Sequence, residues 1–187
     1  MPEAILGAAT FDPAVAITLD PGPGMVTLRG DHAATPIPEA VLASTGLAMP
    51  ERRRITMAGD HAAAWMSPDE TLLLTPPGNG PRLAAALTTA LADVHHLAVD
   101  VSAARRMFRI TGPGARECLA KGAPVDLAPA AFGPGDLRRT RLGQVAVAFW
   151  MVDVETFNLV CFRSVAAFTA QWLATAAAPG SLPGHLR

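Results

Sequence analysis

Short stretches in which apolar residues alternate with polar ones, or run together, recur between residues 25 and 102, a pattern typical of β-strands. Four of them are expected to form strands: Met25–Arg29, Ala62–Met66, Thr71–Thr75 and His96–Ser102. The turn residues Ser67-Pro68-Asp69-Glu70 join the second and third strands into a hairpin. A further stretch, Arg53–Ala58, also alternates, with Ile55 and Met57 pointing the same way.

Two helical patterns lie between these strands. Pro38–Thr45 begins near a proline and is followed by Gly46, and these residues favour a helix start and a helix stop. A second helix is indicated by one apolar stripe, formed by Leu83, Leu87, Leu91 and Val94. The strand after it places Leu97, Val99 and Val101 on one face. This half of the chain therefore predicts the order β-α-β-β-α-β.

The following half repeats this organisation, with strands predicted at Arg106–Thr111, Arg138–Leu142, Val145–Val152 and Thr156–Phe162. Gly112-Pro113-Gly114 is expected to begin a helix that buries Ala115, Cys118 and Leu119, and the loop Pro124–Gly135 follows it. The run Val145–Val152 is continuously apolar, as in a strand covered on both faces. Ser164 is the predicted N-cap of a last helix. The inward stripe of this helix is predicted to be Val165, Phe168, Trp172 and Ala176.

Proline and glycine clusters divide the chain into four parts. These are an irregular arm at residues 1–24, a first half at 25–102, a second half at 103–178 and a tail at 179–187. Within the arm, Val15–Leu19 is the stretch that suits an edge strand. Alternating strands and helices with embedded hairpins predict an α+β fold of two ferredoxin-like β-α-β halves with mostly antiparallel sheets.

Composition narrows the classes of protein that fit this pattern. The chain has 187 residues, of which 50% are hydrophobic and only 17% charged, with a net charge of -1. High hydrophobicity excludes a disordered chain, and the lack of excess basic residues disfavours nucleic-acid binding. A surface poor in charge indicates apolar contact with a protein partner. Residues 1–10 do not resemble a signal peptide and no apolar run could span a membrane, so we expect a cytoplasmic protein.

Candidate chemistry is sparse. Cys118 and Cys161 lie in apolar patterns and are predicted to be small buried residues, and no cysteines or histidines have metal-ligand spacing. The tripeptide Gly-Asp-His occurs twice, ending at His32 and at His61. It is typical of a turn at the end of a strand, and it would equally allow an aspartate to orient a histidine for catalysis. We therefore predict no catalytic, cofactor-binding or metal-ligating residue in this chain.

Partner contacts are the remaining function that the residues themselves suggest. Arginines cluster at the beginnings of predicted strands. They are solvated strand ends, a docking surface for an acidic partner, or a site for the glutamate tail of folate or a substrate carboxylate. From these clusters Arg106 and Arg139 are the candidate interface residues. Trp65 and Trp150 lie in sheet runs and are candidates for the core or for the interface, and we expect at least one of them to be largely exposed.

Several motifs between residues 99 and 168 resemble the aminomethyltransferase superfamily, which includes the T-protein of the glycine cleavage system. They are Asp100-Val101-Ser102, then Phe108-Arg109-Ile110-Thr111-Gly112-Pro113-Gly114-Ala115, then Leu119, then Val125-Asp126-Leu127. Within that superfamily the chain is similar to the gamma subunits of heterotetrameric sarcosine oxidase. This narrower likeness rests on Leu28-Arg29-Gly30, Trp65-Met66-Ser67-Pro68-Asp69-Glu70 and Ala120-Lys121-Gly122-Ala123-Pro124-Val125-Asp126-Leu127.

The resemblance implies a non-catalytic structural subunit without a cofactor of its own. In such enzymes, sarcosine is oxidatively demethylated to glycine and the one-carbon unit passes to tetrahydrofolate. The resemblance places FAD, FMN, NAD, tetrahydrofolate and zinc in partner subunits, named alpha, beta and delta. The net charge and the lack of a membrane-spanning apolar run predict no nucleic-acid or membrane partner.

One departure from the superfamily bears on folate. The folate-using transferases hold an acidic residue in the hairpin after the long loop, and here that hairpin is only Leu142-Gly143-Gln144. Two alternatives stay open. Instead of a sarcosine oxidase subunit, the chain could be a free-standing folate-binding protein of the superfamily, or a gamma subunit of a related dehydrogenase acting on an N-methyl amino acid.

Overall fold

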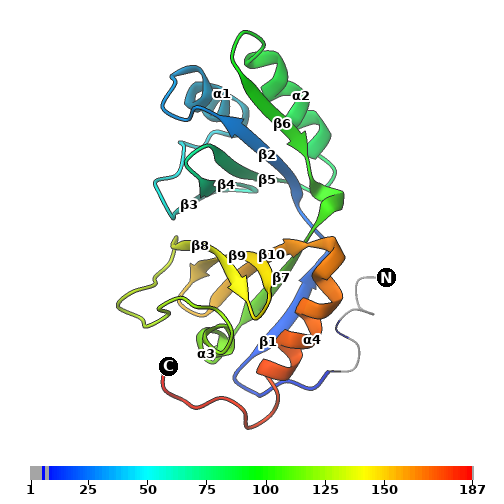
Figure 1. The fold of residues 1–187 in the computed structure, drawn as a ribbon, viewed down its shortest axis with the longest axis vertical. Coiled ribbons are helices and arrows are strands. Elements are labelled where there is room, and N and C mark those ends of the chain that lie inside the picture. The colour runs from blue at the N-terminus through cyan, green and yellow to red at the C-terminus, as the bar shows by residue number, and fades with distance from the viewer. Residues whose placement is uncertain (1–5, 7–8, 187) are drawn as a thin grey trace. The chain divides into compact units, whose positions relative to one another are not determined.

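The computed structural model describes residue 6 and residues 9–186. The chain divides into two compact units (Figure 1), of which the inner unit is Gly22–Ala103. The outer unit is assembled from the segments on both sides, Met1–Pro21 and Ala104–Arg187. Most of the residues on which the signal-peptide prediction rests, residues 1–5, 7 and 8, lie outside the described part of the chain.

The inner unit is an antiparallel sheet with two helices. Its elements are β2 (Gly24–Gly30), α1 (Pro36–Thr45), β3 (Ile55–Ala58), β4 (His61–Ser67), β5 (Glu70–Thr75), α2 (Gly80–Ala90) and β6 (His96–Asp100). The five-stranded sheet has the order β3-β4-β5-β2-β6. The alternating stretch at Arg53–Ala58 forms β3, so the order is β-α-β-β-β-α-β, with one strand more than predicted.

The leucine stripe of α2 closes the core of this unit, as predicted. Leu83, Leu87 and Leu91 are buried, and they pack with residues of α1 and with Val26 and Leu28 of β2. Helix α1 ends at the predicted residue, because Gly46 adopts a left-handed φ of 73° and donates its backbone N–H to the carbonyl of Leu42.

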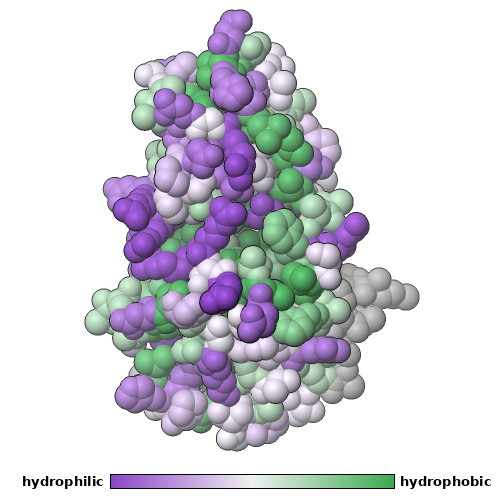
Figure 2. Space-filling view, viewed as in Figure 1, coloured by the Kyte–Doolittle hydropathy of each residue, from purple (hydrophilic) through white to green (hydrophobic). Residues whose placement is uncertain are grey.

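Strand β6 lies at one edge of the sheet, paired only with β2. The predicted alternation is present, but the face that carries Leu97 and Val99 is turned away from the helices, and these side chains are 49% and 41% exposed. Ala98, on the other face, packs on the core of the unit. Figure 2 shows hydrophobic residues gathered over the region where β6 and α2 lie. This unit therefore presents an apolar sheet edge to solvent.

The outer unit is a second antiparallel sheet with two helices. Its elements are β1 (Ala16–Asp20), β7 (Arg105–Thr111), α3 (Ala115–Ala120), β8 (Leu137–Leu142), β9 (Val145–Asp153), β10 (Thr156–Phe162) and α4 (Ala166–Ala176). The sheet order is β1-β7-β10-β9-β8, so the predicted edge strand in the arm is present as β1. Two antiparallel sheets, each with helices, confirm the α+β class.

Helix α4 faces the sheet differently from the prediction. Its buried residues are Ala166, Thr169, Ala170, Leu173 and Ala176. Phe168 is 45% exposed, so the predicted inward stripe is wrong for it, whereas Trp172 is half-buried and packs against the core of this unit. Small residues on the packed face let the helix lie close to the sheet. The predicted cap is wrong as well, because Val165 is the N-cap and no side chain caps the helix.

Candidate functional site

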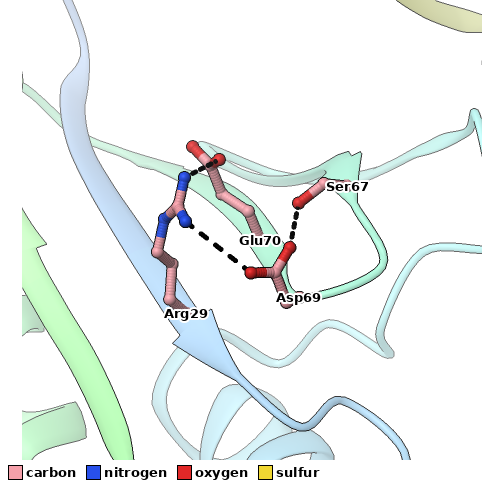
Figure 3. A network of polar contacts seen from close by, with 4 residues as sticks. All are labelled: Arg29, Ser67, Asp69 and Glu70. Carbon is pink, nitrogen blue, oxygen red and sulfur yellow. Dashed lines mark hydrogen bonds and ion pairs between the residues drawn. The ribbon is translucent and has the colours of Figure 1, made fainter.

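Two of the motifs that carry the family resemblance meet in the inner unit, where Arg29 of β2 lies opposite Glu70 of β5 (Figure 3). The guanidinium donates a hydrogen bond of 2.7 Å to Glu70 Oε2 and lies 3.6 Å from Asp69 Oδ2. The Ser67 hydroxyl donates to Asp69 Oδ1, and the backbone N–H of Gly30 donates to the Asp69 carbonyl. The side chain of Glu70 is only 4% exposed, so Arg29 supplies a partner that a buried carboxylate requires. The network fixes the β4–β5 hairpin onto β2.

His32 lies next to this network. Its Nε2 atom is buried and has no hydrogen-bond partner among the described residues. Burial lowers the pKa of His32, against smaller opposing effects of the carboxylates of Asp69 and Asp31. The hydrogen bond from Ser67 lowers the pKa of Asp69, and the charge of Arg29 acts in the same direction. Burial therefore favours the neutral form of this imidazole beside a charged network.

His61, the second histidine of the repeated Gly-Asp-His, lines a hollow of about 310 Å³ with Ser44, Asn79 and Arg82. Its Nε2 atom lies 3.2 Å from the Thr75 hydroxyl oxygen. A hydroxyl beside an imidazole is part of a nucleophilic triad, but the described residues that line this hollow include no carboxylate to orient the ring. The arrangement therefore lacks the third member that such catalysis needs.

The third family motif lies in the outer unit and supports α4. The Lys121 ammonium donates hydrogen bonds to the Ala176 carbonyl and to the Ser181 hydroxyl oxygen. The next residue, Gly122, lies against the Trp172 ring so closely that a Cβ there would be 2.1 Å from Cζ2 of the indole. This motif therefore joins the end of α3 to α4 and to the tail after it.

A buried arginine in α3 was not recognised in the sequence. Arg116 is 8% exposed and donates Nη1 to the carbonyls of Leu127 and Phe132, at 2.7 and 2.8 Å. Its guanidinium lies 5.6 Å from the centre of the Phe157 ring. Arg116 thus fastens the loop between α3 and β8, and the only sequence signal for it was a charge within an apolar helix.

The cysteines are both buried and unpaired in disulfides, as predicted. Burial raises the pKa of Cys118 to about 12, against a smaller opposing effect of Lys121. Burial also raises the pKa of Cys161. A protonated, buried thiol is a poor nucleophile and a poor metal ligand, so both residues serve the core.

The four candidate interface residues are placed differently from one another. Trp150 is fully buried, so it has no surface to offer a partner and the expected exposure is wrong for it. Trp65 is half-buried, and therefore neither tryptophan is largely exposed. Arg106 is half-buried and donates Nη1 to the Arg105 carbonyl, whereas Arg139 is exposed on β8. The burial of Trp150 follows from its position in a strand covered on both faces.

The β8–β9 turn is where the superfamily resemblance implies an acidic residue for folate. The β8–β9 hairpin turns at Gly143, with a left-handed φ of 57°, and Trp172 Nε1 would lie 3.2 Å from a Cβ at this position. No carboxylate stands in this turn, which joins Leu142 to Val145. Within residues 6 and 9–186 no group of three or more potential ligands could hold a metal ion. No helix in the same part of the chain is long and apolar enough to cross a membrane.

Known proteins share both the fold and the sequence motifs described above. A protein named sarcosine oxidase subunit gamma from Corynebacterium sp. (strain P-1) is 31% identical over 136 residues, which are 72% of this chain and 66%, just under two thirds, of that protein. The structure of heterotetrameric sarcosine oxidase from Corynebacterium sp. U-96, in complex with pyrrole 2-carboxylate, matches with a TM-score of 0.84. This match has 27% identity and covers 94% of this chain and 90% of the matched chain.

A more distant likeness defines the fold alone. The aminomethyltransferase T of the glycine cleavage system from Bartonella henselae matches with a TM-score of 0.63 at 13% identity, over 87% of this chain and 46% of that one. The family model described as the sarcosine oxidase gamma subunit family matches residues 29–179, a span that includes most of the motifs named above. The chain therefore belongs to the sarcosine oxidase gamma subunit family.

Proposed function

We propose that this chain is a non-catalytic, structural subunit of a multi-subunit sarcosine oxidase. The observation that supports this most is the fold match to a chain of a heterotetrameric sarcosine oxidase, which extends over 94% of this chain. The conspicuous polar groups described above also fit a scaffold. Arg29, Glu70, Arg116 and Lys121 are engaged with their own chain.

In this proposal the chemistry belongs to other subunits. The assembly oxidatively demethylates sarcosine to glycine and passes the one-carbon unit to tetrahydrofolate, in the cytoplasm. The partner subunits, alpha, beta and delta, hold FAD, FMN, NAD, tetrahydrofolate and zinc. This chain contributes two compact units whose surface is poor in charge, a property that favours burial against a partner.

Co-expression tests the proposal. We expect the chain purified alone to be colourless and inactive toward sarcosine. When it is tagged and co-expressed with the alpha, beta and delta subunits of its own host, we expect it to retain a flavin-containing complex that turns over sarcosine. Failure of the tagged chain to retain flavin-containing partners would contradict the proposal, as would sarcosine turnover by the single chain.

The two alternatives give different outcomes in the same preparation. A free-standing folate-binding protein would remain a monomer in sedimentation and would bind tetrahydrofolate in calorimetry without partners. A subunit of a related dehydrogenase would assemble, but its complex would prefer another N-methyl amino acid to sarcosine.

Charge reversal tests the proposed interface residues. Arg106→Glu and Arg139→Glu are expected to slow assembly and to change its dependence on salt, since charges at an interface rim act mainly on association. Trp65→Ala tests the proposed apolar contact in the same way, and it is expected to weaken assembly. A complex that forms at the normal rate with these variants but loses activity would exclude a docking role for them.

A further inference from the structure

A groove of about 430 Å³ lies along the exposed side of α4 in the outer unit. It is lined by Lys121, Phe168, Gln171, Trp172, Thr175 and Ala176. Phe168 is 45% exposed and Trp172 is half-buried, so two aromatic rings meet solvent on one helix. Aromatic side chains are enriched in protein interfaces, where a ring that fills or borders a pocket contributes most of the binding energy.

The groove is held in a fixed shape by glycines. Trp172 lies against Gly122, where a Cβ would be 2.1 Å from the ring, and against Gly143, where it would be 3.2 Å from Nε1. The backbone N–H of Gly143 donates to the carbonyl of Gly122, so the two glycines support the indole together. Its inner side is thus packed on backbone while its outer side lines the groove, which makes it a preformed binding surface.

The charge of the groove indicates what it receives. Among the described residues that line it, Lys121 is the one that carries a charge, and none is acidic. Two protons of its ammonium are used in hydrogen bonds to the Ala176 carbonyl and the Ser181 hydroxyl, which fix the group at the rim. The third proton stays available for an acceptor. An apolar side chain next to a carboxylate satisfies both features.

We propose that this groove is a docking site for another subunit of the assembly, which inserts an apolar side chain between Phe168 and Trp172 and places an adjoining carboxylate on Lys121. This inference rests on the proposed function, because it requires that partner subunits exist. It differs from the interface suggested by the arginine clusters, because the contact is centred on aromatic residues of α4.

The test compares two exposed hydrophobic residues on helices. Phe168→Ala removes one side of the groove, whereas Leu42→Ala, at a residue 53% exposed on α1, is the control. Affinity for the partner subunits is measured by surface plasmon resonance with the wild-type complex as reference. We expect Phe168→Ala to weaken binding about tenfold or more, as for an interface hot spot. Leu42→Ala should stay within about twofold of the wild type, as for a residue outside the interface.

Charge variants test the second half of the proposal. Lys121→Met is expected to weaken binding and to reduce its dependence on salt, whereas Lys121→Arg, which retains the positive charge, should preserve the dependence on salt. Thermal unfolding of the isolated chain controls for folding. Phe168→Ala should change the melting temperature only slightly, because Phe168 is 45% exposed and is not among the buried residues of α4.

The outcomes separate this inference from the proposed function. If the wild-type chain binds no partner subunit, the proposed function fails. If the wild type binds and Phe168→Ala binds equally well, the docking site is wrong while the proposed function stands. A markedly lower melting temperature in Phe168→Ala would show that the groove packs within the same chain, and would overturn the inference. If the wild-type chain self-associates and Phe168→Ala makes it a monomer, the groove binds a second copy of the chain, which would also overturn the inference.

Discussion

Replacing Arg116 with methionine is expected to loosen the loop between α3 and β8 and to destabilise the outer unit. The guanidinium donates to the carbonyls of Leu127 and Phe132, which both lie in the middle part of this loop. It also lies over the Phe157 ring, within the cluster that Phe132, Phe149 and Phe157 form with centroid separations of 5.7 to 6.5 Å. Methionine keeps the apolar part of the side chain but cannot donate.

The magnitude follows from the two carbonyls. A hydrogen bond from a charged group contributes about 1.5–3 kcal/mol, so two such bonds give about 3–6 kcal/mol. Part of this is recovered, because the variant no longer buries a charge, and burial already lowers the pKa of Arg116. We therefore expect Arg116→Met to lower the free energy of unfolding by about 2–4 kcal/mol, with the loop affected first.

Urea titration gives the free energy, and amide hydrogen exchange over residues 124–135 gives the local effect. Arg141→Met is the control, because Arg141 is exposed on β8 and a surface substitution should change stability by less than about 0.5 kcal/mol. If Arg116→Met unfolds at the same urea concentration as this control and the loop amides keep their protection, Arg116 does not fasten the loop.

Three more predictions concern other buried contacts. In a double-mutant cycle of Arg29→Met and Glu70→Gln we expect a coupling energy of about 1–2 kcal/mol. This value lies between those of exposed and buried ion pairs, because Glu70 is buried and Arg29 is 47% exposed. Additive effects of the two substitutions would contradict the pairing. Burial raises the pKa of Cys118 to about 12 in the folded chain, so stability measured by urea is expected to fall as the pH rises above about 9, and Cys118→Ala should reduce this slope, to which Cys161, whose pKa burial also raises, contributes as well. The chain has no tyrosine to add to the slope. Gly122→Ala should cost about 1–3 kcal/mol in thermal unfolding, because its Cβ overlaps Trp172, and an unchanged melting temperature would contradict that contact.

The fold was predictable wherever one face of an element differed clearly from the other. The stripe Leu83, Leu87 and Leu91 identified the buried face of α2 because charged or small residues surround it. Helix α4 has no such contrast, since Gln171 is its most polar residue and apolar residues occur on every side. Periodicity therefore gave the helix but not its orientation, and Phe168 was assigned to the wrong face.

The sites were less predictable, because they depend on register and on close approach. The sequence identified Arg29 and Glu70 only as parts of separate motifs, and their pairing exists because β2 and β5 align them as cross-strand neighbours. Likewise, Gly122 and Trp172 lie far apart in the chain, so their contact follows only from the position of α4. Trp150 is the opposite case, since its apolar strand already indicated burial on both faces.

The inner unit interrupts a pair of neighbouring strands, because Asp20 at the end of β1 pairs with Met107 near the start of β7. During synthesis β1 emerges first, and its partner emerges only after the whole of Gly22–Ala103 has left the ribosome. The inner unit can fold in that interval, and its own pairing of β2 with β6 brings its two ends together. Its folding shortens the loop that β1 and β7 must close, which saves about 2 kcal/mol of chain entropy. We therefore expect ribosome-bound chains ending near residue 135 to contain a folded inner unit and an outer unit that is not yet folded, because β9 and β10 have not been synthesised. A folding defect in the inner unit should then delay folding of the outer unit as well.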